Sequence, residues 1–388
     1  MKAMLVIKNG LVHDAVNKTP YTADIVCENG KIISISGNVD VADSKEVEVI
    51  DATGLHIYPG FVEAHGHIGL DGYGIGYEGQ DYNELNDPIT PQLNAIDGIN
   101  PFDEAFEYAR EAGVTTVATG PGSSNVLGGT FTAIKTYGKR IDNMIVKDKV
   151  AMKCAFGENP KRCYKTKSIY SRMTTAAKLR EMLYKAKEYN AKIKEAGEDI
   201  SKKPAFDYKL EALLPVVNKE IPLKAHAHRA DDIFTAIRIA KDLDVNLTLE
   251  HCTEGHLIVD ELVKDNYPVA VGPSFGQATK VELKNKTFKT PGVLSKAGLN
   301  VSIITDCPVI PLQYLPLCAG LAVESGMDPF DALKAITINP ARHLGIEDRV
   351  GSISVGKDAD FVITDGVPFN IETKVRYTII GSEIVYKR

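Results

Sequence analysis

Residues 56–67 read HIYPGFVEAHGH, an apolar run that ends in two histidines separated by a single glycine. A short apolar run of this kind is typical of a buried β-strand. Side chains two residues apart on an extended chain point to the same side, so His65 and His67 can chelate one metal ion. Gly66 between them lets another backbone segment pack closely. The stretch therefore predicts a strand that runs into a metal-binding pair.

The rest of the central sequence alternates apolar runs with helical stretches, such as the long charged helix expected from about residue 174 to 195. This alternation is typical of repeated βα units, and 388 residues suffice for a barrel plus an accessory domain. We expect an α/β fold, a (β/α)8 TIM-like barrel with strands near residues 56–62, 114–119, 129–134, 149–156, 221–226, 246–251, 268–272 and 301–305.

Both ends of the chain are rich in short alternating strands instead. The same alternation of apolar and polar residues occurs near the start, in MLVIKNG, ADIVCENG and KIISISG, and near the end, in GSISVGKDADFVITDG and KVRYTIIGSEIVYK. We expect the two ends to pair into one small β-sandwich domain. The predicted domains are residues 1–53 and 347–388 for the sandwich and residues 54–346 for the barrel.

Composition narrows the classes of protein to consider. The net charge of −6 argues against a nucleic-acid partner, which prefers a basic face. The sequence has no run of 18 apolar residues and no signal-peptide pattern at its start, so we expect no membrane span. Six scattered cysteines without a CxxC pair favour free thiols and a cytoplasmic location.

Further metal-binding side chains follow three of the predicted strands. His226 and His228 come after the fifth strand, His251 after the sixth and Asp306 after the eighth. In a parallel barrel these strand ends meet at one face, where catalytic residues gather. Imidazole and carboxylate suit Zn²⁺ and related divalent ions. The sequence therefore predicts a site for one or two divalent ions, with zinc as the first choice.

Taken together, these motifs resemble the amidohydrolase superfamily, which has HxH near the start, a histidine after strands five and six, and an aspartate after strand eight. The segments IDATGLHIYPGFVEAHGHI and VGSISVGKDADFVI are also similar to it. The resemblance covers nearly the whole chain and is closest to the imidazolonepropionase-related branch, which includes metal-dependent dipeptidases.

The resemblance implies a role for each motif residue. His65 and His67 would bind the more buried metal, and His226 and His251 would bind the second. Asp306 would be both a ligand and the general base. His226 is preferred to His228 because similar enzymes use the first histidine of H-A-H. His228 would then contact the substrate or support the ligands.

The ligand from strand four has two candidates. Many members of the superfamily carry a carboxylated lysine there, and other branches carry a glutamate. Lys153 and Glu158 are five residues apart, so on a regular strand they face opposite sides and only one of them reaches the metal. We predict Glu158, which sits at the strand end, and keep Lys153 as the alternative.

The implied activity is hydrolysis of a C–N bond in a small molecule: an amide, a cyclic amide or a dipeptide. Metal-activated water would attack the carbonyl while Asp306 moves the proton. The glycine-rich segment 69–79 offers Tyr73 and Tyr77 as substrate contacts, and Arg162 can clamp a substrate carboxylate.

Two other functions stay open. Deaminases on this fold typically have H-x-x-E after strand five, but the corresponding residue here is Arg229 or Asp231, depending on the histidine. A catalytically inactive barrel is the second alternative, although such relatives usually lose metal ligands. Self-association into a homo-oligomer is a further possibility that rests on analogy alone.

Overall fold

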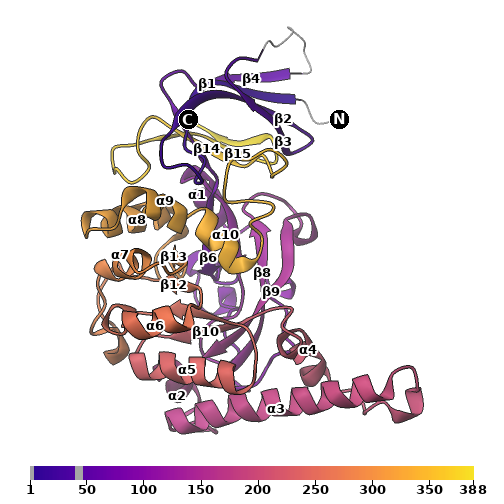
Figure 1. Cartoon of the computed structure of the whole chain (residues 1–388). Coiled ribbons are helices and arrows are strands. Elements are labelled where there is room, and N and C mark those ends of the chain that lie inside the picture. Colours follow the sequence, from indigo (N-terminus) through magenta and orange to yellow (C-terminus); the bar gives the residue numbers. More distant parts are fainter. Residues whose placement is uncertain (1–3, 40–46) are drawn as a thin grey trace.

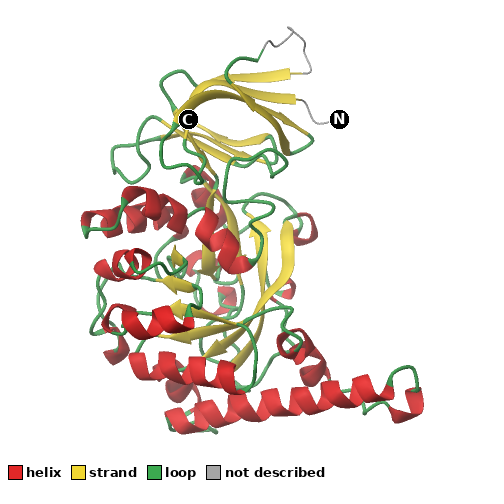
Figure 2. Ribbon diagram, in the orientation of Figure 1, coloured by secondary structure: helices red, strands yellow, loops and turns green. Residues whose placement is uncertain are grey.

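The computed structural model describes residues 4–39 and 47–388. Two eight-stranded sheets organise it. One sheet lies at the top of Figure 1, where the strands near the N-terminus (indigo) and the C-terminus (yellow) lie side by side. The other forms the centre of the body below, and helices cover its outer side (Figure 2). The amino- and carboxyl-terminal segments therefore build one unit, as the sequence predicts.

The upper sheet has the order β16-β15-β14-β5-β1-β2-β3, with β4 paired to β1. Strand β5 is parallel to β1 and antiparallel to β14, so it joins the two ends of the chain. The strands are β1 (Met4–Val12), β2 (Tyr21–Glu28), β3 (Lys31–Ser36), β4 (Val47–Asp51), β5 (His56–Pro59), β14 (Phe361–Thr364), β15 (Val375–Ile380) and β16 (Glu383–Lys387).

This sheet encloses its own hydrophobic core. Leu5 and Ile7 from the start of the chain pack in one buried cluster with Ile57, Phe361 and Ile363. Leu5 and Ile7, like Phe361 and Ile363, are two residues apart and therefore face the same side of their strand. The exact domain limits stay a prediction, since β5 extends the upper sheet beyond residue 53.

The lower sheet is the barrel. Its strands follow the chain in order, from β6 at one edge to β13 at the other. They are β6 (Phe61–Gly66), β7 (Val114–Thr119), β8 (Leu127–Lys135), β9 (Ile145–Ala155), β10 (Leu223–Ala227), β11 (Leu247–His251), β12 (Val269–Val271) and β13 (Val301–Ile303). Each of the eight predicted barrel strands overlaps a strand of the structure.

Strand β8 departs from the predicted parallel barrel, because it runs antiparallel to both β7 and β9. The connections 120–126 and 136–144 that flank it are short. A parallel crossover needs a dozen or more residues, usually with a helix, whereas short connections permit only antiparallel neighbours. The β7–β8 connection consequently lies at the carboxyl end of β7, at the barrel mouth.

The first predicted strand also divides in two at Gly60. Residues 56–59 belong to the upper sheet as β5, and only β6 enters the barrel. A side chain at Gly60 would place its Cβ 2.1 Å from Thr115 Oγ1, so a glycine is required where the chain passes between sheets.

Helices follow most of the barrel strands. The predicted long helix is α3, which begins after Ser171, whose side chain accepts a hydrogen bond from Thr174 N, and ends at Gly197. The helices are α1 (Ala105–Glu111), α2 (Glu158–Tyr164), α3 (Arg172–Ala196), α4 (Tyr208–Val217), α5 (Ala230–Asp242), α6 (Val259–Asp265), α7 (Lys289–Lys296), α8 (Leu315–Glu324), α9 (Pro329–Ala335) and α10 (Ile338–Leu344).

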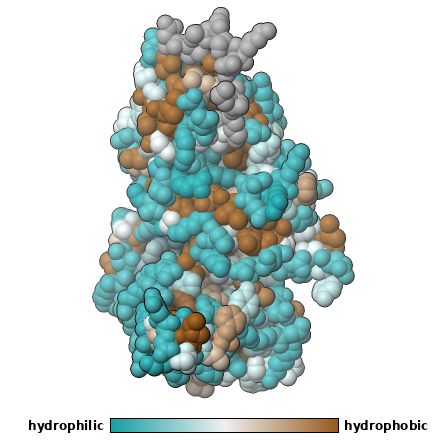
Figure 3. Space-filling model, turned by 90° about the vertical axis from the view of Figure 1, so that its right-hand side faces the viewer, coloured by the Kyte–Doolittle hydropathy of each residue, from teal (hydrophilic) through white to brown (hydrophobic). Residues whose placement is uncertain are grey.

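The surface mixes polar and apolar residues. Figure 3 shows apolar patches between hydrophilic regions, one of them across the middle of that face. Helix α3 reaches past the barrel in Figure 1, and the exposed side chains of Ile200 and Phe206 lie in the segment that follows it. None of the helices in the described residues combines the length and the apolar content that crossing a bilayer requires.

Asp358 ties the upper sheet to the barrel. Its buried carboxylate lies 2.7 Å from the Lys31 ammonium of β3, 2.9 Å from that of Lys135 in β8 and 2.9 Å from the Arg349 guanidinium. Lys135 also contacts the carboxylate of Asp360. Burial alone would raise the pKa of Asp358, but the three cations outweigh it and lower that pKa to about 2.

We expect Asp358→Asn to lower the free energy of unfolding by about 2 kcal/mol at pH 7, because the pKa of this carboxyl is about 2 in the folded protein and about 3.9 in the unfolded chain. A depressed native pKa stabilises the fold above pH ~4, and this contribution is lost as the pH falls toward 2. Urea unfolding should therefore show a wide gap between wild type and variant at pH 7 and a narrower one at pH 3.

The matched control is Asp142→Asn, which removes an exposed carboxylate paired with Arg140. Exposed ion pairs contribute little, so this variant should unfold like wild type. Equal behaviour of the two variants would show that Asp358 does not join the sheets as described.

Candidate metal centre

The first group of candidate ligands comes from the two edge strands of the barrel. His65 and His67 lie at the end of β6, and Asp306 follows β13. Asp306 Oδ1 is 3.3 Å from His67 Nε2 and 3.6 Å from His65 Nε2. The ligand atoms of these three residues lie within 4.8 Å of one another, so they can share one ion.

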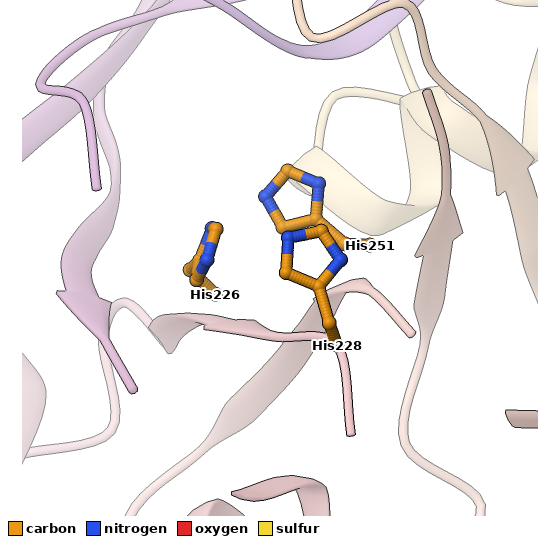
Figure 4. A group of neighbouring side chains, drawn as sticks. All are labelled: His226, His228 and His251. Atoms are coloured by element: carbon orange, nitrogen blue, oxygen red, sulfur yellow. The ribbon is translucent and has the colours of Figure 1, made fainter. Parts of the chain in front are cut away.

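The second group is formed by His226, His228 and His251, from β10 and β11. Their ring centroids are 4.3 to 4.6 Å apart, and their ligand atoms also lie within 4.8 Å of one another. Figure 4 shows the three rings gathered around a common space. The structure brings both His226 and His228 into this group, so the choice between them as ligand stays a prediction.

The two groups adjoin. The ring centroids of His65 and His251 are 5.1 Å apart. His251 and Asp306 both have the left-handed backbone that non-glycine residues rarely adopt, with φ of 71° and 53°. Such strained positions cluster at functional sites. The five imidazoles and Asp306 that the sequence predicted together are indeed brought together.

Hydrogen bonds fix the orientation of four of the rings through Nδ1. His67 donates to Gly120 O and His251 donates to Gly272 O, both at 2.7 Å. His65 Nδ1 is 2.9 Å from Glu250 Oε2, and His228 Nδ1 is 2.7 Å from Thr253 Oγ1. When Nδ1 carries the proton, the lone pair of Nε2 is available for a metal.

The electrostatics of the site also fit a metal. Burial is the largest cause that lowers the pKa of His65, His226 and His228 well below the usual value, and it lowers that of His251 to about 4. These imidazoles are therefore neutral, as ligation requires. Both ring nitrogens of His226 and Nε2 of His251 are buried without a hydrogen-bond partner. A divalent ion would satisfy one nitrogen of each ring, and unpartnered nitrogens are otherwise costly to bury.

The fourth barrel strand is β9, and it brings Lys153 to the histidines. Its buried Nζ lies 3.0 Å from His65 Nε2, and burial lowers its pKa to about 8. Glu158 is not brought to the histidines, since its carboxylate accepts a hydrogen bond from Glu282 N at 2.9 Å. The prediction of Glu158 assumed that the strand reaches it. Strand β9 ends at Ala155, however, and Gly157, with φ of 80°, turns the chain into α2.

A buried polar network supports the first group. Glu250 accepts hydrogen bonds from His65, Lys224 and His343 at 2.8 to 2.9 Å. Glu63 accepts from His65 N and from both N and Oγ1 of Thr305. It therefore links the edge strand β6 to the segment that follows the other edge strand, β13. Burial raises the pKa of Glu63 to about 8.

A cavity of about 450 Å³ opens onto the site. Its lining includes His67, His226, His228 and Asp306. Among the predicted substrate contacts, Tyr77 and Arg162 line it. Tyr73 lies elsewhere, with its ring centroid 5.2 Å from that of Tyr108.

Sequence analysis missed three residues at this cavity. Lys280 and Tyr82 belong to its lining, and the Tyr82 ring stacks on His67. Glu282 is fully buried, with Oε1 3.8 Å from His228 Nε2. No spacing or motif marks these residues, since each comes from a loop whose course depends on long-range packing.

Comparisons with known proteins identify the family. The family model described as Amidohydrolase family matches residues 56–385. A solved structure, an amidohydrolase from Thermotoga maritima MSB8, is 41% identical, has a TM-score of 0.95 and covers 99% of this chain and 100% of that chain.

Curated relatives are more distant. Amidohydrolase tasK of Hapsidospora irregularis is 26% identical over 90% of this chain, adenine deaminase 1 of Latilactobacillus sakei 22% over 93%, and imidazolonepropionase of Geobacillus sp. (strain WCH70) 24% over 93%. The chain spans 38% of the length of the first, 54% of the second and 87% of the third.

We expect Lys153→Ala to lower the metal content of the purified protein and Glu158→Ala to leave it near the wild-type value, because only Lys153 reaches the histidines. Elemental analysis of both variants checks this. The reverse pattern, with metal lost only from Glu158→Ala, would restore the glutamate as the strand-four ligand.

Proposed function

The chain belongs to the amidohydrolase family, and on that premise we propose that it is a metal-dependent hydrolase that cleaves a C–N bond in a small molecule. The bond is an amide, a cyclic amide or a dipeptide bond. The observation that carries this proposal is that two candidate metal-binding groups share the wall of one cavity.

The residues suit a divalent ion of the zinc type, held by the groups of His65 and His226. Such an ion lowers the pKa of water from about 15.7 toward 7 and polarises a substrate carbonyl. The protein contributes neutral imidazoles with fixed Nδ1 atoms and a cavity above them. One or two ions fit this arrangement.

Asp306 is the residue that we assign as proton carrier. It lines the cavity, and its side chain is 15% exposed, so substrate and water reach the carboxylate. Hydrolysis forms a C–O bond and breaks the C–N bond. Asp306 accepts the proton that the attacking water loses and delivers it to the leaving nitrogen. His228, also in the lining, either binds metal or contacts the substrate carbonyl.

We assign Lys153 as the metal ligand from β9, the fourth barrel strand. Its lowered pKa of about 8 leaves part of the amine neutral near pH 7. A neutral amine can add carbon dioxide and become a carbamate, as the family resemblance implies. The carbamate would supply the negative charge and the two oxygen donors that an ammonium lacks.

The cavity size and lining favour a small polar substrate. About 450 Å³ lies within the range of small-molecule sites. Arg162 and Lys280 place two cations in the lining, and Tyr77 adds an aromatic surface. We assign Arg162 to a substrate carboxylate and Tyr77 to the substrate body, and we expect the protein to work in the cytoplasm, where its six free cysteines stay reduced.

Deamination is the second candidate function, because a curated relative is named adenine deaminase. Arg229 and Asp231 occupy the positions where the resemblance would require glutamate. In the structure these two side chains pair with each other at 2.8 Å. Hydrolysis without release of ammonia therefore remains the preferred activity.

A substrate panel tests the activity. We expect N-acyl amino acids, dipeptides or cyclic amides to be cleaved into a carboxylate and an amine, with no ammonia released from adenine. Removal of metal by a chelator should abolish turnover, and added Zn²⁺ should restore it. Ammonia release from adenine would favour the deaminase, and turnover that persists without metal would contradict the proposal.

We expect Asp306→Asn to lower kcat by roughly 10²–10⁴-fold, the usual contribution of a general acid–base group. The amide still offers an oxygen to the site, so much of the metal should remain, as elemental analysis would show. Asp331→Asn, which removes a surface carboxylate paired with Lys334, is the control and should keep full activity. Full activity of Asp306→Asn would rule out the assigned role.

A further inference from the structure

Glu282 is a buried carboxylate that faces the second histidine group. It lies in the short 3-10 turn Val281–Leu283 of the connection after β12, and its side chain is fully buried. Its Oε1 is 3.9 Å from His226 Nε2 and 3.8 Å from His228 Nε2. The carboxylate therefore approaches the two atoms through which these histidines would bind an ion.

Hydrogen bonds with the surrounding backbone orient this carboxylate. Glu158 N donates to Glu282 Oε2 at 2.9 Å, and Glu282 N donates to Glu158 Oε1 at 2.9 Å. This reciprocal pair locks the start of α2 to the turn. A Cβ at Gly157 would lie 2.4 Å from Glu282 Oε2, so glycine is needed there. Because Oε2 is occupied by the backbone, Oε1 is the oxygen that faces the histidines, and it also pairs with the Lys280 ammonium.

Charge gives a second reason for a carboxylate at this place. The first group contains Asp306 and lies beside Lys153, whose carbamate would add a negative charge there, but His226, His228 and His251 are neutral and supply none. A divalent ion buried among neutral donors would be poorly compensated, and uncompensated buried charge is costly. Lys280, 2.9 Å from Glu282 Oε1, is itself a cation and cannot play this part.

Distance is the third reason. Zinc binds nitrogen and carboxylate oxygen at about 2.0–2.2 Å, so neighbouring donors around a tetrahedral ion lie roughly 3.3–3.6 Å apart. Glu282 Oε1 is 3.9 Å and 3.8 Å from the two Nε2 atoms, slightly longer separations that a small shift of the side chains would close. An ion there would also satisfy the unpartnered Nε2 of His226.

We propose that Glu282 is a direct ligand of an ion held at His226 and His228 of the second group. This inference rests on the proposed metal-dependent function and adds a ligand to it. With His226 and His228 the carboxylate makes three protein donors, the number typical of a catalytic zinc site, so a fourth position stays open for water.

The test measures metal binding, not turnover. Metal-free wild type, Glu282→Gln and Glu254→Gln are each titrated with Zn²⁺, and bound zinc is counted by elemental analysis. We expect two ions per chain in the wild type. In Glu282→Gln one ion should stay tight, while the dissociation constant of the other rises at least ~10-fold, since even residues behind the ligands are worth about 10–100-fold.

Glu254→Gln is the matched control. Glu254 is a buried carboxylate nearby that accepts from Ala230 N and Asn285 Nδ2 and makes neither contact with the histidines. It should bind zinc like the wild type. If Glu282→Gln binds both ions as tightly as the wild type, Glu282 is not a ligand and the inference fails.

A second variant, Lys280→Met, removes the ion pair but keeps Glu282. It should retain both zinc ions, and loss of one ion would overturn direct ligation in favour of a structural ion pair. Direct ligation requires that both ions are retained, so this variant can still overturn the inference if Glu282→Gln does not fold. Failure of the proposed function is distinguishable, because the wild type would then bind no zinc or cleave nothing in the panel.

Discussion

The burial of five imidazoles at one mouth of the barrel is the constraint on which the rest depends. Burial lowers the pKa of His65, His226, His228 and His251, and the resulting neutral ring offers one donor and one acceptor nitrogen. In four of the five rings a neighbouring carbonyl, hydroxyl or carboxylate fixes Nδ1, which directs Nε2 to the shared space. Such packing would be costly for an ion-free core, and a bound cation offsets the cost. These residues are His65, His67, His226, His228 and His251.

The polar network beneath the site serves orientation more than stability. Buried ion pairs such as Lys224–Glu250 rarely stabilise a fold more than apolar packing would. Glu250, however, fixes the ring of His65, and Glu63 links the two segments that carry His65 and Thr305. The first metal-binding group also spans the junction between the edge strands β6 and β13, so its geometry depends on how these two strands are aligned.

The reversed strand β8 has a consequence for the cavity. Because β8 runs back from the mouth, the β7–β8 connection lies beside the histidines. Gly120 from this connection accepts the hydrogen bond of His67, and Gly122, Ser123 and Ser124 line the cavity. A helical crossover at this point would have left the mouth on that side without these groups.

The sequence by itself determined the strands, the pairing of the chain ends and the order of His65, His67, His226, His251 and Asp306 at strand ends, because periodicity and chain order are local properties. Only the tertiary structure decided the direction of β8, the approach of Lys153 instead of Glu158, and the presence of Lys280 and Glu282 beside the cavity. These depend on where a strand stops and how a loop folds back. Contacts between residues more than a hundred positions apart, such as Glu158 with Glu282, fix that course, and no local pattern encodes them.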